Sequence, residues 1–190
     1  MSAELKARQT PTRRLPGEVG LWIFIFSDLL LFALYFGLCV FDRAVDPVGF
    51  REAQGALNTT IALFNTLVLL SGSWAVFMAT RVTADKARAA TYVVGAALCG
   101  VLFLILKVYE YAHLIGAGRH FIEGRFFTWY FFLTGYHALH VMAGIVLLWV
   151  LSSRYRGQTE PSEKLVEGVG CYWHLVDLLW IGIFLVLYLL

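Results

Sequence analysis

The chain has 190 residues, of which 59% are hydrophobic and only 15% are charged, whereas a soluble domain usually carries about 25% charged residues. The apolar residues come in long, uninterrupted blocks, which indicates a lipid bilayer rather than a water-soluble core. The formal net charge of +2 and the lack of a basic stripe interleaved with aromatic residues argue against a nucleic-acid-binding protein.

A polar, basic segment, residues 1–16, precedes the first apolar block. We expect this segment to form a cytoplasmic tail. The block that follows is about 25 residues long, which is too long for the core of a signal peptide, and it lacks a small-residue cleavage site. We therefore interpret the block as a membrane helix that the protein retains.

Five apolar blocks are long enough to span about 30 Å of hydrocarbon. Short joining segments separate them and hold most of the charged residues. The sequence therefore predicts an all-α, polytopic membrane protein that folds as one five-helix transmembrane bundle over residues 17–190. The predicted helices span about residues 17–41, 57–80, 90–113, 126–152 and 170–190.

Lysine and arginine are divided unevenly between the two sides of the predicted bundle. The N-terminal tail and the second and fourth loops share one side and hold Lys6, Arg8, Arg13, Arg14, Arg81, Lys86, Arg88, Arg154, Arg156 and Lys164. The other side holds only Arg43, Arg51, Arg119 and Arg125. Because cytoplasmic loops are enriched in these residues, we predict a cytoplasmic N-terminus and a C-terminus outside.

Asp28 is an ionisable residue inside the first predicted helix, where a charge is costly unless it has a partner or a task. It lies about eleven residues from the cytoplasmic end, and His140 lies about twelve, so at 1.5 Å per residue the two reach nearly the same depth. His137, one turn further out, is the second candidate partner. Asp28 is either a protonated carboxyl that hydrogen-bonds a neighbouring helix or, with these histidines, a proton-exchanging group.

Lys107 and Glu110 lie three residues apart on the third predicted helix, near its outer end. Residues at this spacing are neighbours on one face of a helix, so we expect an ion pair between them. From such a position the long lysine side chain also reaches toward the membrane interface.

The fifth predicted helix repeats that spacing with His174 and Asp177, near its cytoplasmic end. Trp173, Asp177 and Trp180 share a face of this helix. Two interpretations remain open for these four residues. They form either an aromatic belt around a satisfied carboxylate, or a set of contacts for lipid headgroups or another subunit.

The histidines do not predict a cofactor site. A haem with two histidine ligands needs them at similar depth, yet the level of His174 lies roughly 10 Å from that of His140 and further from that of His137. The three cysteines lie within apolar blocks and form no CxxC pair, which is typical of helix packing rather than of a metal site. We therefore expect this chain to bind no haem, copper or other metal.

Each predicted helix carries one motif that resembles the haem–copper oxidase subunit III family, and the motifs follow the family order. They are Ser27–Asp28 followed by Phe32, Asn65–Thr66 followed by Leu69–Ser71, Glu110–Tyr111, Thr134–Val141 followed by Gly144, and Tyr172–Trp180. The resemblance covers about residues 16–190 and is highly specific.

The resemblance implies a non-catalytic accessory subunit in a bacterial plasma (inner) membrane. Its implied partner is the catalytic subunit of a respiratory haem–copper terminal oxidase or nitric oxide reductase, which alone carries the haem and copper. The family also implies phospholipid bound in a cleft between helices, and support for assembly and proton supply in aerobic or denitrifying electron transport. The family residue that matches Asp28 is a buried carboxylate near that cleft.

Several departures from the family pattern favour one of its branches. Asp28 replaces the usual glutamate, and Lys107 stands where the oxidase subunits usually have glutamine. The five predicted helices correspond to the short form of the family. Lys107 and the opening Leu15–Trp22 are more similar to the accessory (NorE-type) branch of nitric oxide reductases. Both catalytic partners, an oxidase and a reductase, therefore remain open.

A function of another class, a small membrane transporter or proton channel, is the alternative. Asp28, Asn65, Thr66, His137 and His140 supply part of the polar path that it needs. However, transporters often bind substrate at helices broken by proline or glycine, and all four prolines fall outside the apolar blocks. A membrane-bound cytochrome b is disfavoured by the histidine depths.

Overall fold

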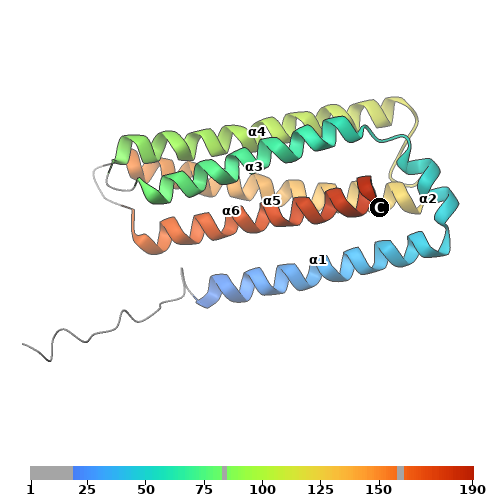
Figure 1. Ribbon diagram of the computed structural model, residues 1–190, viewed down its shortest axis with the longest axis horizontal. Helices are drawn as coiled ribbons and strands as arrows, with labels where there is room; N and C mark the ends of the chain where they lie inside the picture. Colours follow the sequence, from blue (N-terminus) through green and yellow to red (C-terminus); the bar gives the residue numbers. More distant parts are fainter. Residues whose placement is uncertain (1–18, 83–84, 158–160) are drawn as a thin grey trace, which may run out of the picture.

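The computed structural model describes residues 19–82, 85–157 and 161–190 of the chain. Five of its helices are long and apolar enough to cross a membrane, so the predicted five-helix membrane fold is confirmed (Figure 1). The predicted tail, residues 1–16, lies outside the described residues. The helices are α1 (Val19–Val45), the short α2 (Pro47–Gln54), α3 (Thr59–Arg81), α4 (Lys86–Gly116), α5 (Arg125–Arg156) and α6 (Glu163–Phe184), followed by a π-helical turn, Leu185–Leu189.

Polar side chains cap the first turns of α3, α4 and α6. Helices α4 and α6 begin before their predicted apolar blocks, at Lys86 and Glu163, whereas α3 begins at Thr59, inside its block. The side-chain oxygens of Asn58, Asp85 and Ser162 accept hydrogen bonds from the backbone N–H three residues later. Such a cap satisfies a donor that the helix itself leaves free. Hydropathy therefore marks the part of each helix that crosses the membrane, whereas capping residues mark where the helix begins.

Helices α3 to α6 form a four-helix bundle in which α3 packs against α4, α4 against α5, α5 against α6, and α6 against α3. Helix α1 runs along the outside of this bundle and packs against α5 and α6 (Figure 1). Only Ile25, Asp28, Phe32 and Cys39 of α1 are buried. The first helix is therefore attached to the bundle by one narrow stripe.

The indole of Trp173, on α6, fills a socket made by glycines on the three other helices of the bundle. A Cβ at Gly100 would lie 2.8 Å from Trp173 Cη2, and one at Gly144 would lie 2.9 Å from Trp173 Cε3. A Cβ at Gly72 would lie 3.5 Å from Trp173 Cζ2. Small residues let membrane helices approach closely, and here they make room for a tryptophan in the core.

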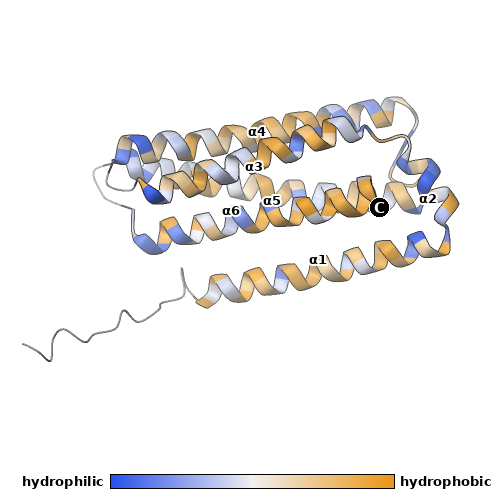
Figure 2. Ribbon diagram, in the orientation of Figure 1, coloured by the Kyte–Doolittle hydropathy of each residue, from blue (hydrophilic) through white to orange (hydrophobic). Residues whose placement is uncertain are grey.

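Hydrophilic residues gather at the two ends of the bundle and on α2, while apolar residues cover the middle of the helices (Figure 2). Large apolar side chains such as Ile23, Leu30, Trp74, Val108 and Trp149 are more than half exposed. An apolar surface of this kind fits a bilayer and needs no polar cover there.

Helix α2 closes the end of the bundle where α1 finishes and α3 begins (Figure 1). Asp46 caps it by accepting from Gly49 N at 3.0 Å, and Pro47 stands in its first turn, where a missing N–H costs nothing. Its buried Phe50 packs edge-on against Phe126 of α5. We call this end of the protein the α2 end.

Candidate functional site

Asp28 of α1 and His140 of α5 meet between the two helices. Asp28 Oδ1 lies 3.3 Å from His140 Nε2, and their side chains are only 6% and 10% exposed. The depth argument placed the two residues at one level, and the lateral packing of α1 on α5 brings them into contact. The other carboxylate oxygen of Asp28, Oδ2, has no hydrogen-bond partner among the described residues.

The second nitrogen of His140 determines where its protons lie. His140 Nδ1 is 3.0 Å from the carbonyl oxygen of Tyr136, and a carbonyl oxygen only accepts hydrogen bonds. Nδ1 therefore carries a hydrogen, so Nε2 either accepts from a protonated Asp28 or donates to an ionised one. In both states one proton lies between the carboxyl and the imidazole, and the pair as a whole is neutral.

Aromatic rings surround this pair. The rings of Phe32 and Tyr136 lie 5.8 and 4.9 Å from the His140 ring, and the Tyr172 hydroxyl donates to the His140 carbonyl oxygen at 3.2 Å. Phe32 is fully buried. These aromatic neighbours make the surroundings of the pair apolar, and a hydrogen bond in such surroundings is stronger than in water.

A second polar contact attaches α1 to α5 at the α2 end. Asp42 accepts from Trp129 Nε1 at 2.8 Å and from Arg125 Nη1 at 3.3 Å. The sequence analysis did not single out these residues, although an aspartate directly after an apolar block was a signal. With Asp28 and His140, this contact holds α1 against α5 at two levels.

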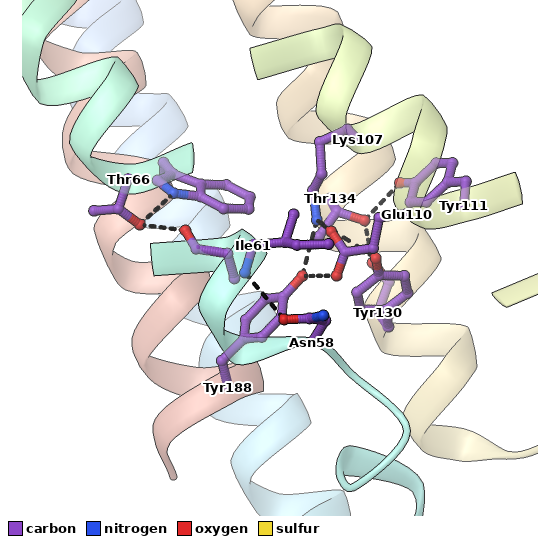
Figure 3. A network of polar contacts seen from close by, with 11 residues as sticks. Asn58, Ile61, Thr66, Lys107, Glu110, Tyr111, Tyr130, Thr134 and Tyr188 are labelled. Atoms are coloured by element: carbon purple, nitrogen blue, oxygen red, sulfur yellow. Dashed lines mark hydrogen bonds and ion pairs between the residues drawn. The ribbon is translucent and has the colours of Figure 1, made fainter. Parts of the chain in front are cut away.

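Lys107 and Glu110 form an ion pair that is enclosed by the bundle rather than directed to the membrane interface. Lys107 Nζ lies 2.8 Å from Glu110 Oε2, and both side chains are 4% exposed. The Tyr188 hydroxyl lies 2.9 Å from Lys107 Nζ and donates to Glu110 Oε1 at 2.7 Å, as Figure 3 shows. Tyr130, 3.4 Å from Nζ, completes the set.

Aromatic faces also hold the Lys107 ammonium. It lies 5.1, 4.9 and 5.4 Å from the ring centroids of Tyr130, Trp180 and Tyr188, within the range of cation–π attraction. Tyr130, Trp180 and Tyr188 were not assigned to this pair from the sequence, because their positions on α5 and α6 reveal no contact with α4. Tyr188 lies on the π-helical turn, a local geometry that hydropathy does not predict.

His137 lies apart from the Asp28–His140 pair, inside the four-helix bundle. It is fully buried, with its ring edge-on to Phe103 at 5.5 Å and tilted against Trp180 at 5.4 Å. Neither of its ring nitrogens has a hydrogen-bond partner among the described residues. The two histidines of α5, three residues apart, therefore occupy different environments.

The four residues of α6 that were expected to contact lipid or another subunit divide into two groups. Trp173 and Trp180 are only 1% and 0% exposed, so they do not contact lipid or a partner, and that expectation is corrected for both. They belong to the bundle core because their face of α6 is turned toward α3, α4 and α5. Asp177 is also buried, at 6% exposed, so the expectation is corrected for it as well. His174 is exposed and hydrogen-bonds Ser73 of α3 through Nδ1.

In the part of the chain that the structure describes, no three histidine, cysteine, aspartate or glutamate side chains are grouped so that they could hold a metal ion. The polar side chains form two buried pairs, Asp28 with His140 at 3.3 Å and Lys107 with Glu110 at 2.8 Å.

Comparisons with known proteins agree with this architecture. The family model for cytochrome c oxidase subunit III matches residues 2–190. The chain is 32% identical over 182 residues to cytochrome c oxidase subunit 3 of Corynebacterium diphtheriae, covering 90% of this chain and 86% of the relative. It is 29% identical over 178 residues to cytochrome bo(3) ubiquinol oxidase subunit 3 of Pseudomonas aeruginosa, covering 90% and 83%. It is 30% identical over 177 residues to the probable cytochrome c oxidase subunit 3 of Mycobacterium leprae, covering 90% and 86%.

Proposed function

The chain belongs to the cytochrome c oxidase subunit III family, and from this premise we propose that it is a non-catalytic accessory subunit of a respiratory haem–copper terminal oxidase or nitric oxide reductase. The observation that carries the proposal is the family match over almost the whole chain. Relatives of similar identity are named as subunits of a cytochrome c oxidase and of a ubiquinol oxidase. These two oxidases take electrons from different donors. A subunit that occurs in both therefore has a role that does not depend on the donor, which supports an accessory function.

We assign the haem and copper of the complex to the partner subunit and none to this chain. We propose that this partner, or a lipid headgroup, covers the exposed contact between His174 and Ser73. A polar side chain on the outside of a membrane helix is costly in hydrocarbon, so a protein or headgroup surface is the favourable cover. This contact lies on the face shared by α3 and α6, and Asp177 is one turn away.

Phospholipid is the second partner that we propose for this chain. Helix α1 buries only a narrow stripe against α5 and α6, and apolar side chains such as Phe26 and Leu34 are exposed on it. An exposed apolar helix held at two polar points is suited to retaining acyl chains along its sides. Loss of α1 contacts should therefore release lipid as well as weaken assembly.

We further propose that the Asp28–His140 pair exchanges protons in support of proton supply to the complex. The argument is chemical: the contact at 3.3 Å holds one proton that either group can carry. Moving that proton between the two leaves the net charge of the pair unchanged, because the charged state is an ion pair and not a lone buried charge.

We also propose that the protein lies in a bacterial plasma membrane with its N-terminus, including the tail of residues 1–16, in the cytoplasm. The distribution of lysine and arginine supports this orientation. On this assignment the α2 end, with Arg43, Arg51, Arg119 and Arg125, is the outer end. The Asp28–His140 pair then lies near the bilayer centre.

Purification of this chain with an affinity tag from native membranes, in mild detergent, tests the proposal. We expect a haem–copper catalytic subunit to copurify in a one-to-one ratio, with a reduced-minus-oxidised haem spectrum. Mass spectrometry of the copurified chain distinguishes an oxidase from a nitric oxide reductase. Recovery of the chain without any haem protein, under conditions that keep other respiratory complexes intact, contradicts an accessory role.

A further inference from the structure

One level of the four-helix bundle combines polar side chains from all four helices around Trp180. Trp180 Nε1 donates to Thr66 Oγ1 of α3 at 2.9 Å, its ring lies 5.4 Å from the His137 ring of α5, and Lys107 Nζ of α4 lies 4.9 Å from its centroid. Asn65 precedes Thr66 in the chain and is fully buried. We call Asn65, Thr66, Lys107, His137 and Trp180 the polar layer.

Two members of the polar layer have unsatisfied hydrogen-bonding groups. Both ring nitrogens of His137 and both amide atoms of Asn65 are buried without a partner among the described residues, and both residues are 0% exposed. A neutral imidazole and an amide each present at least one donor and one acceptor. Leaving such groups unpaired in a protein interior is costly. A ligand that both donates and accepts hydrogen bonds therefore suits this layer.

The charge in the layer is already compensated. Lys107 is paired with Glu110 at 2.8 Å and Glu110 also accepts from Tyr188 at 2.7 Å, so the layer exerts no net attraction on an anion or a cation. The ligand that fits is neutral and small. Water meets both conditions, and a buried water typically makes about three hydrogen bonds to protein groups that lack other partners.

A pocket at the α2 end borders Glu110, the ion-pair partner of Lys107. It has a volume of about 490 Å³ and lies between the segment 56–61 at the start of α3 and the last turns of α4, and Glu110 forms part of its wall. Asn58, Thr59 and Thr60 also line it. Glu110 is paired with Lys107 (Figure 3), and the Lys107 ammonium lies over the ring of Trp180.

We propose that the polar layer is a buried water-binding site, in which His137 and Asn65 hold water that enters through the pocket beside Glu110. The site is distinct from the Asp28–His140 pair, which lies between α1 and α5. It adds to the accessory role a hydrated position inside the four-helix bundle. Hydrogen bonds to water then explain why His137 and Asn65, whose polar atoms have no partner among the described residues, are stable in the bundle core.

A density map of the purified native complex in lipid nanodiscs, at a resolution that shows ordered water, tests the proposal directly. We expect density within hydrogen-bonding distance of a His137 ring nitrogen and of the Asn65 amide. A direct contact between His137 and Asn65, or an empty layer, overturns it. The measurement uses the unsubstituted protein, so it does not depend on any variant folding.

A double-mutant cycle on thermal unfolding in the same nanodiscs gives a second test. His137→Leu and Asn65→Leu should each lower Tm, and the double variant should lose clearly less than the sum, because removing one ligand of a shared water already leaves the other unpaired. The control is the pair His137→Leu and Ser73→Ala, which also lies on α5 and α3 but shares no water. Its two losses of Tm should add. Additive losses for His137 and Asn65 overturn a shared water.

X-ray radiolysis of the native complex in 18O-water tests access from the pocket. Radicals form at bound water, so His137 should gain 18O faster than Leu148, a fully buried residue of the same helix, after allowing for the reactivity of each side chain. Thr60→Trp, at the mouth of the pocket, should slow that labelling while leaving the haem content unchanged. Labelling of His137 no faster than of Leu148 contradicts the proposal.

Discussion

Asp28 Oδ1 and His140 Nε2 lie 3.3 Å apart, and the bond of His140 Nδ1 to the Tyr136 carbonyl leaves one proton between the carboxyl and the imidazole. This polar contact holds α1 to the bundle, and in the proposed function it is also the pair that exchanges a proton. Substitutions at Asp28 therefore affect attachment and proton exchange differently.

Asp28→Asn should keep the shape and part of the hydrogen bonding, so the complex should assemble in normal yield. Asp28→Leu should leave His140 unpaired, at a cost of about 1–3 kcal/mol, and should lower the amount of catalytic subunit that copurifies. If the pair exchanges protons, the Asp28→Asn complex should lose activity progressively during turnover. Equal turnover lifetime and pH dependence for Asp28→Asn and the unsubstituted complex would leave the pair with a structural role only.

Removing one member of the Lys107–Glu110 pair should destabilise the protein strongly. Lys107→Met leaves Glu110 as an unpaired buried charge, so we expect a loss of about 3–5 kcal/mol, whereas Lys107→Met with Glu110→Gln should recover much of it. The exposed pair of Arg119 and Glu123, at 2.8 Å, is the matched control, and Arg119→Met should cost at most about 1 kcal/mol. Thermal unfolding in nanodiscs measures all three, and similar losses for the buried and exposed pairs would refute the argument.

The glycine socket should tolerate no added methyl group. Gly144→Ala places a Cβ 2.9 Å from the Trp173 ring, and overpacking of this kind costs about 1–3 kcal/mol. Gly95→Ala is the control, because no atom lies within 4 Å of its added Cβ, and replacing a helical glycine there should be neutral or favourable. The yield of folded protein and its Tm should separate the two variants, and an unchanged Tm for Gly144→Ala would mean that the helices separate at no cost.

The orientation of the chain is testable with reporters fused to each end. A reporter that is active only in the cytoplasm should work at the N-terminus and fail after Leu190, and a reporter active only outside should behave in the opposite way. The reason is the concentration of lysine and arginine on the side of the N-terminal tail. Cytoplasmic activity after Leu190 would reverse the topology and place the α2 end inside.

The sequence by itself determined the number of membrane helices and the depth of each residue along them. Both follow from local properties, since a span is read from hydropathy over about 20 residues and depth increases by 1.5 Å per residue. This is why the levels of Asp28 and His140 could be matched without a structure. The motifs likewise identified the family, because each lies within one short segment.

Only the tertiary structure decided which face of each helix is turned inward. Lipid is as apolar as a protein core, so a membrane helix is hydrophobic on all sides and its pattern does not mark the packed face. Trp173 and Trp180 therefore looked like surface contacts in the sequence but lie in the bundle core. For the same reason the sequence did not reveal that Tyr188 closes around Lys107, or that His137 turns toward Trp180 while His140 turns toward Asp28.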